Sequence, residues 1–79
     1  GGVPDDVPEV ELTAPMTLLQ VLRDGELAPS NKEARRLLQQ GAVSIDGERV
    51  DDPGHDLAAR PEPYLLKVGK RRFLRVTIR

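Results

Sequence analysis

Basic side chains recur at helical spacing in one segment of the chain, and a second group of them lies near its C-terminal end. Positions i, i+3, i+4 and i+7 of the first segment share one face of a helix, and they carry Lys32, Arg35, Arg36 and Gln39. The second group surrounds a Gly-Lys pair and consists of Lys67, Lys70, Arg71 and Arg72. Rows of Lys and Arg suit phosphates, because each contact releases condensed counterions and an Arg guanidinium grips two phosphate oxygens. These residues therefore indicate nucleic-acid binding.

Both groups also have a simpler interpretation, in which charged side chains only solvate an exposed helix face and an exposed hairpin. Two features favour contact with RNA over this alternative. The four residues of the helix face include no acid, and a second basic group accompanies them. We therefore predict that both groups together form an RNA-binding surface.

Charge is distributed unevenly along the chain, although the net charge is only −1. Residues 1–29 carry six acids against Arg23 alone, a balance of −5, whereas residues 61–79 carry six bases against Glu62 alone, a balance of +5. Such segregation allows a basic patch while it keeps non-specific binding to RNA weak.

No constellation in the chain supports catalysis, a metal or a cofactor. Ser30 is interpreted as a helix cap, Asp51-Asp52 as part of a turn, and His55, the one histidine, as an exposed loop residue. Gly69-Lys70 fails the phosphate-binding loop pattern, which needs Gly at position 64 and Ser or Thr at position 71. The chain has no cysteine, which excludes disulfides and thiolate metal sites.

Two helices must position the first basic group. The first is expected from about Thr17, a candidate N-cap, to Asp24, with Gly25 as a left-handed cap. The second follows the pattern S-x-x-E of Ser30 and Glu33, which predicts a capping box, and Gly41 predicts its end.

After the second helix the period of the apolar residues changes from 3.6 to 2, which predicts strands. Asp46-Gly47 lies between short alternating runs and predicts a type I′ hairpin. A second hairpin is expected from Tyr64–Val68 and Phe73–Ile78, whereas residues 55–63 are expected to be a loop anchored by Leu57. The predicted core consists of Leu18, Leu22, Leu37, Leu38, Val43, Ile45, Leu66, Val76 and Ile78. Phe73, one of two aromatic residues, is also expected to pack in the core.

The prediction for the whole chain is an α+β domain over residues 16–79, with two packed helices followed by a small, mostly antiparallel sheet. Residues 1–15, with three prolines and four acids, are expected to be an extended tether, and alternation of Val10 and Leu12 with acids admits a short edge strand there. No apolar run is long enough to span a membrane and no signal peptide is recognised, so a cytoplasmic location is expected.

The stretch LAPSNKEARRLLQQGAVSIDGERV, residues 27–50, resembles the S-four RNA-binding domain, which also occurs at the end of bacterial tyrosine–tRNA ligases. PSNKEARR within it, LLKVGKRRFLRV at residues 65–76 and VPDDVPEVEL at residues 3–12 are most similar to the ligase version. Many S-four domains have Arg directly after the capping Ser, where this chain has Asn31.

The resemblance implies a non-catalytic domain that holds the body of tyrosine tRNA, near its long variable arm, for a separate catalytic domain of the same parent chain. Contacts are expected mainly to phosphates, because the chain lacks the paired aromatic residues of single-strand base readers. Three alternatives remain: a free-standing protein that binds ribosomal RNA, the targeting module of an RNA-modifying enzyme, and a protein-interaction domain that uses the apolar side of the first helix.

Overall fold

A computed structural model describes residues 3–79, so Gly1 and Gly2 of the predicted tether lie outside the described residues. The elements, in chain order, are β1 (Glu9–Leu12), β2 (Met16–Thr17), α1 (Leu18–Asp24), α2 (Asn31–Gln39), β3 (Val43–Ile45), β4 (Glu48–Arg49), β5 (Asp56–Leu57), β6 (Tyr64–Val68) and β7 (Arg72–Ile78).

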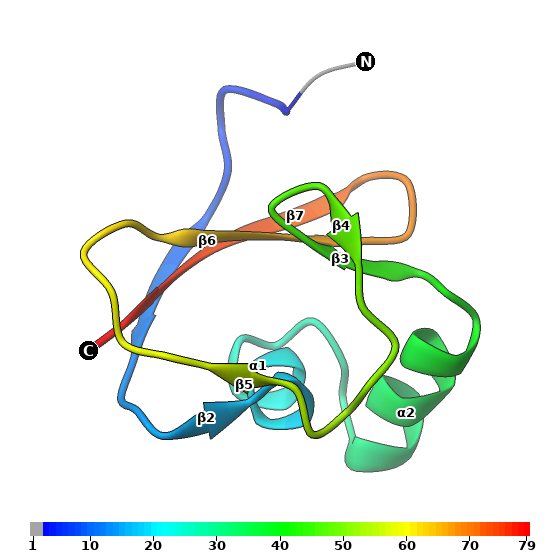
Figure 1. Ribbon diagram of the computed structural model, residues 1–79. Helices are drawn as coiled ribbons and strands as arrows, with labels where there is room; N and C mark the ends of the chain where they lie inside the picture. The colour runs from blue at the N-terminus through cyan, green and yellow to red at the C-terminus, as the bar shows by residue number, and fades with distance from the viewer. Residues whose placement is uncertain (1–2) are drawn as a thin grey trace.

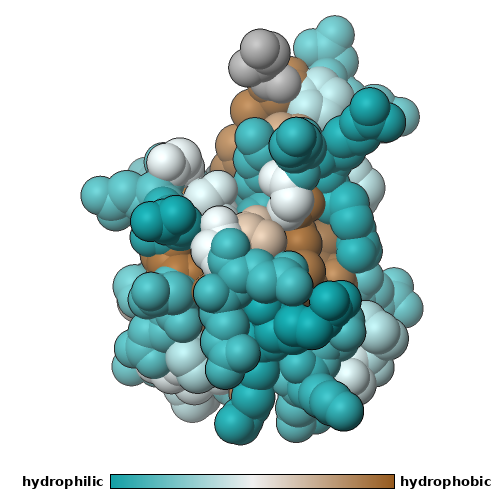
Figure 2. Space-filling view, turned by 90° about the vertical axis from the view of Figure 1, so that its right-hand side faces the viewer, coloured by the Kyte–Doolittle hydropathy of each residue, from teal (hydrophilic) through white to brown (hydrophobic). Residues whose placement is uncertain are grey.

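Within residues 3–79, five strands form one sheet in the order β1-β7-β6-β3-β4, and β2 and β5 form a separate antiparallel ribbon. The sheet is antiparallel except between β1 and β7, where Val10 lies opposite Val76. The sheet is the upper layer in Figure 1, and α1, α2 and the ribbon lie below it. The predicted α+β class, with two packed helices and a mostly antiparallel sheet, is confirmed. Two short strands, β1 and β2, precede the helices. The surface over α2 is mostly hydrophilic (Figure 2).

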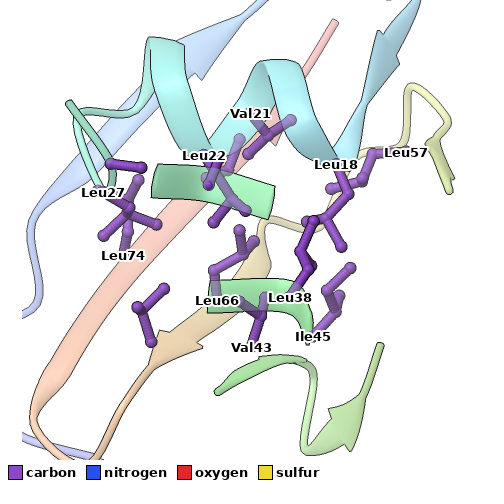
Figure 3. Close-up of a cluster of buried hydrophobic side chains, with 14 of the residues drawn as sticks. Leu18, Val21, Leu22, Leu27, Leu38, Val43, Ile45, Leu57, Leu66 and Leu74 are labelled. Atoms are coloured by element: carbon purple, nitrogen blue, oxygen red, sulfur yellow. The ribbon is translucent and has the colours of Figure 1, made fainter. Parts of the chain in front are cut away.

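An aliphatic core fills the space between the two layers. Leucines of α1 and α2 point toward side chains of β3, β6 and β7, and Leu57 of β5 closes one end (Figure 3). Eight of the nine predicted core residues are buried, and Leu37 is the exception. Ala34 and Leu38, four residues apart, form the buried face of α2, which leaves Leu37 at the rim, where it is only partly buried.

Side chains satisfy the first backbone groups of both helices. The Thr17 hydroxyl accepts a hydrogen bond from the Gln20 N–H, and the Gln20 side chain accepts one from the Thr17 N–H, which completes a capping box in α1. At α2 only half of the predicted box forms. The Ser30 hydroxyl accepts from the Glu33 N–H at 3.2 Å, but the Glu33 carboxylate turns toward Arg36 instead of toward Ser30.

The two helices end differently. Gly41, with φ +69°, lies in the left-handed region after α2, and the N–H groups of Gly41 and Ala42 donate to Leu38 and Leu37, as predicted for this stop. The left-handed cap predicted at Gly25 is wrong, because Gly25 has φ −82° and Glu26, with φ 60°, takes the left-handed conformation. Close packing explains the glycine, since a Cβ on Gly25 would lie 2.7 Å from Cδ2 of Leu74.

Both predicted hairpins form. Asp46 and Gly47 have φ 52° and 88° between β3 and β4, as a type I′ turn requires. Gly69, with φ 67°, starts the turn from β6 to β7, which spans residues 69–71. Residues 55–63 are not entirely loop, because β5 pairs with β2; two residues give no alternation to detect.

Phe73 does not pack in the core, contrary to the prediction. Leu74, Val76 and Ile78 alternate with Phe73 along β7 and point toward the helices, so Phe73 lies on the opposite face of the sheet. There the Lys67 ammonium lies 5.5 Å from the centroid of its ring. Tyr64, the other aromatic residue, packs against the core.

Candidate nucleic-acid interface

The basic face of α2 points into solvent. The side chains of this face are exposed, as predicted for a binding surface: Lys32, Arg35, Arg36 and Gln39. Their opposite side is held by Ala34 and Leu38, whose burial fixes the rotation of the helix about its axis. At the start of the helix Arg23 of α1 donates to the Asn31 side chain at 3.2 Å, so a further guanidinium borders this face.

An acid does lie beside this face, although the four residues themselves include none. Arg36 makes a two-pronged ion pair with Glu33, in which Nε lies 3.2 Å from one carboxylate oxygen and Nη2 contacts the other. The hydrogen bonds of this pair lower the pKa of the Glu33 carboxyl and raise the pKa of the Arg36 guanidinium. The pair partly neutralises Arg36, whereas Arg35 makes no ion pair within the described residues.

The C-terminal basic group divides between the β6–β7 turn and the strands beside it. Lys70 and Arg71 are exposed in the turn, and neither makes an ion pair or a side-chain hydrogen bond within residues 3–79. Lys67 lies on the outer face of the sheet, half-buried beside Phe73. These three cations remain free to meet an anion.

Arg72 differs from its neighbours. Its Nη1 donates to the Leu27 carbonyl at 2.8 Å and its Nη2 to the Glu26 carbonyl at 3.0 Å. Two of its five N–H donors are therefore occupied in tying the start of β7 to the connection between the helices. The structure places Arg72 in a fold-stabilising contact that is distant in sequence.

The two basic groups lie on the same side of the molecule. The Gly69 N–H donates to the Ala42 carbonyl at 2.8 Å, which fastens the β6–β7 turn to the segment that follows α2. In Figure 1 α2 and this turn both lie on the right, and Figure 2 views the molecule from that side. The surface that the sequence predicted in two pieces can therefore meet one extended ligand.

Arg49 also belongs to this surface, and the sequence prediction did not include it. A Cβ on Gly41 would lie 3.2 Å from both Cδ and Nη1 of Arg49, so the Arg49 side chain lies over the end of α2. The hairpin at Asp46-Gly47 brings it there. Because that hairpin was predicted, the register of its two strands was a signal that could have found Arg49.

Asp46 supports the hairpin from below. Its carboxylate accepts from the Leu65 N–H at 2.9 Å and from Arg60 at 2.7 Å, and the Arg60 guanidinium stacks over the Tyr64 ring, 3.6 Å from its centroid. Partial burial works to raise the pKa of Asp46, but the hydrogen bonds from Leu65 and Arg60 outweigh it and lower the pKa below its usual range. This network holds β3 in register with β6, which carries Lys67 of the basic surface.

The described residues offer little to other kinds of site. No group of three or more His, Asp or Glu side chains among residues 3–79 is arranged to hold a metal ion. His55 is exposed, and the Asp52 carboxylate caps its own turn by accepting from the Gly54 N–H. Neither helix in the described part of the chain has the length and apolar character needed to traverse a bilayer.

Comparison with known proteins agrees with the ligase resemblance. A family model described as the tyrosine–tRNA ligase SYY-like C-terminal domain matches residues 2–76. The chain is 48% identical to tyrosine–tRNA ligase from Salinibacter ruber over 96% of its own length and 20% of that protein. For the tyrosine–tRNA ligases of Cupriavidus pinatubonensis and Symbiobacterium thermophilum the identity is 49%, over 99% and 100% of this chain and 19% and 20% of the relatives. The chain thus spans about a fifth of the length of these relatives.

Proposed function

Because the chain belongs to the family of tyrosine–tRNA ligase SYY-like C-terminal domains, we propose that it is a non-catalytic domain that binds tRNA through the sugar–phosphate backbone. The observation that carries this proposal is the side-by-side placement of the exposed face of α2 and the β6–β7 turn, joined by the Gly69–Ala42 hydrogen bond. Backbone contacts position an RNA without reading its bases.

Tyrosine tRNA is the proposed ligand. The exposed cations Lys32, Arg35, Lys70 and Arg71 contact phosphates, with Lys67 and Gln39 beside them, while Arg36 and Arg72 keep their protein partners. Preference for one tRNA then comes from the shape that presents phosphates to both basic groups at once, such as a long variable arm.

The proposed partner within the protein is a catalytic domain in the remainder of a longer chain, because the matched relatives are about five times longer than this chain. In this arrangement the domain orients the tRNA and the catalytic domain attaches tyrosine, in the cytoplasm. The purified 79-residue chain should therefore not activate tyrosine. An assay of tyrosine-dependent pyrophosphate exchange tests this, and measurable exchange would contradict the non-catalytic proposal.

A salt titration tests the proposal. Arg35→Ala and Arg71→Ala each remove an exposed cation, so each should lower the slope of log affinity against log salt by roughly 0.7–0.9. Binding of labelled tyrosine tRNA would be followed by fluorescence anisotropy, folding by circular dichroism, and a short-armed tRNA would serve as the comparison ligand. The matched control is Arg79→Ala. Arg79, the last residue of the chain, is exposed but forms an ion pair with Glu11 and belongs to neither basic group. If both folded variants bind like the wild type with the same slope, these faces are only solvated and the proposal is wrong.

A further inference from the structure

A groove of about 350 Å³ lies between the end of α2 and the β6–β7 turn. Residues 41–44 and Gly69 line it together with three cations: Arg49, Lys67 and Lys70. Among the described residues that line it, none is acidic. The groove therefore concentrates positive charge from three separate strands and turns at one point.

The register of the sheet explains this convergence. Ser44 of β3 lies opposite Arg49 of β4 on one side and opposite Lys67 of β6 on the other. Val43 and Ile45 are buried, so the Ser44 hydroxyl faces outward between the two cations. Neighbouring strands are roughly 5 Å apart, so both long side chains can reach one anion held above Ser44.

Two glycines keep the groove open and in place. Gly41 has φ +69°, and a side chain there would press on Arg49 at 3.2 Å. Gly69, with φ +67°, reverses the chain after β6. Its N–H donates to the Ala42 carbonyl, and the next residue, Lys70, lines the groove. The conformation of both turns thus serves the position of the cations.

We propose that this groove is a phosphate subsite for a backbone phosphodiester of the bound RNA, held by Arg49, Lys67 and Lys70, with the Ser44 hydroxyl as a further donor. The inference rests on the proposed function and adds Arg49 and Ser44 to it. The groove lies between the residues that follow α2 and the turn, so an RNA strand that runs from the exposed face of α2 to the turn can pass over it. Its lining residues make no ion pair within residues 3–79 that would compete for the cations.

Arg49→Gln tests the subsite with labelled tyrosine tRNA and the 79-residue chain. Loss of one phosphate contact should lower the slope of log affinity against log salt by about 0.7–0.9. At 50 mM salt the variant should bind at least about threefold more weakly than the wild type, and the ratio of the two affinities should fall about threefold between 50 and 200 mM salt. Ser44→Glu is the second variant. Its carboxylate would lie between Arg49 and Lys67, where it can form ion pairs that are compatible with folding but occupies the place of the phosphate. Arg79→Gln removes the same charge far from the groove and should bind like the wild type.

The outcomes separate the subsite from the function. Weaker binding by folded Arg49→Gln and Ser44→Glu, with Arg79→Gln unchanged, supports the subsite. If Arg49→Gln does not fold, Ser44→Glu decides. If Arg35→Ala weakens binding while both groove variants bind like the wild type, the subsite is wrong and the proposed function stands. Equal weakening by Arg79→Gln would reduce the effect to net charge and overturn the subsite, and no weakening by any of the variants, Arg35→Ala included, would overturn both.

Discussion

Replacing Gly47 should destabilise the fold through the backbone alone. Gly47 has φ +88° at the second central position of the β3–β4 turn, and a Cβ built there meets no atom within 4 Å. A Cβ at this position therefore clashes with no neighbour, so the cost expected of Gly47→Val is that of a left-handed conformation in a β-branched residue.

The expected magnitude follows from two opposing terms. The left-handed region costs an L-residue roughly 1–2 kcal/mol, with valine near the upper end. Loss of glycine also restricts the unfolded chain, which returns about 0.4–1 kcal/mol. The net destabilisation is then about 1–1.5 kcal/mol, and for a domain of this size it should lower Tm by about 4–12 °C.

Thermal unfolding followed by circular dichroism measures this, with Gly54→Ala as the control. Gly54 does not have positive φ, and a Cβ there would meet only Asp52 Oδ1, at an ordinary 3.5 Å. Gly54→Ala should therefore leave Tm unchanged or raise it. Gly47→Asn should lower Tm less than Gly47→Val does, because asparagine tolerates positive φ. A Gly47→Val melting curve that superimposes on the wild type would refute the backbone argument, and tRNA affinity of the folded fraction should stay the same.

Two further predictions concern contacts that hold the fold together. Asp46 has a lowered pKa in the folded chain, so the stability that its carboxylate contributes is fully present above its ordinary pKa of about 3.9 and is lost as the pH falls from there through the lowered pKa. Asp46→Asn, which keeps an Asn-Gly turn, should cost about 0.2–1 kcal/mol at pH 7 and progressively less as the pH is lowered below about 3.9, as urea unfolding over this pH range would show. Arg72→Lys keeps the charge but loses the planar fork that spans two carbonyls, so it should lower the free energy of unfolding by about 1–3 kcal/mol while the salt slope of tRNA binding stays the same; an unchanged stability together with a reduced slope would show that Arg72 acts on RNA.

Elements fixed by local chemistry could be predicted from the sequence. Asp46-Gly47 selects one turn type, Ser30 caps one helix and Gly41 ends it, each within a few residues of the backbone that it controls. The alternation of Leu74, Val76 and Ile78 also determines which face of β7 is inward. The same alternation assigns Phe73 to the outer face, because it directly precedes the inward-facing Leu74 in the strand.

Contacts between distant segments could not be read in the same way. The pairing of β2 with β5 joins two-residue strands about 40 positions apart, too short for any periodic pattern. The parallel partner of β1 depends on which edge of the sheet is left open after β3, β6 and β7 have paired. The Glu33–Arg36 pair is different, since its i, i+3 spacing is visible in the sequence. The Glu33 carboxylate can either complete the capping box with Ser30 or pair with Arg36, and only the structure shows that it pairs with Arg36.

Arg71 and Arg72 show why a basic run alone cannot assign a binding site. The two residues are adjacent and chemically identical, yet Arg72 donates to the carbonyls of Glu26 and Leu27, more than 40 residues away, whereas Arg71 projects from the turn. Backbone direction separates them, because Arg72 is the first residue of β7 and its side chain lies beside the connection between the helices. A phosphate that gripped Arg72 through both terminal nitrogens would have to compete with the hydrogen bonds that Nη1 and Nη2 already make, each to a carbonyl that would then lose its partner. Binding energy should therefore concentrate on cations whose donors are free, which is the reason to expect opposite phenotypes from these neighbours: weaker tRNA binding for Arg71 variants and a less stable fold for Arg72 variants.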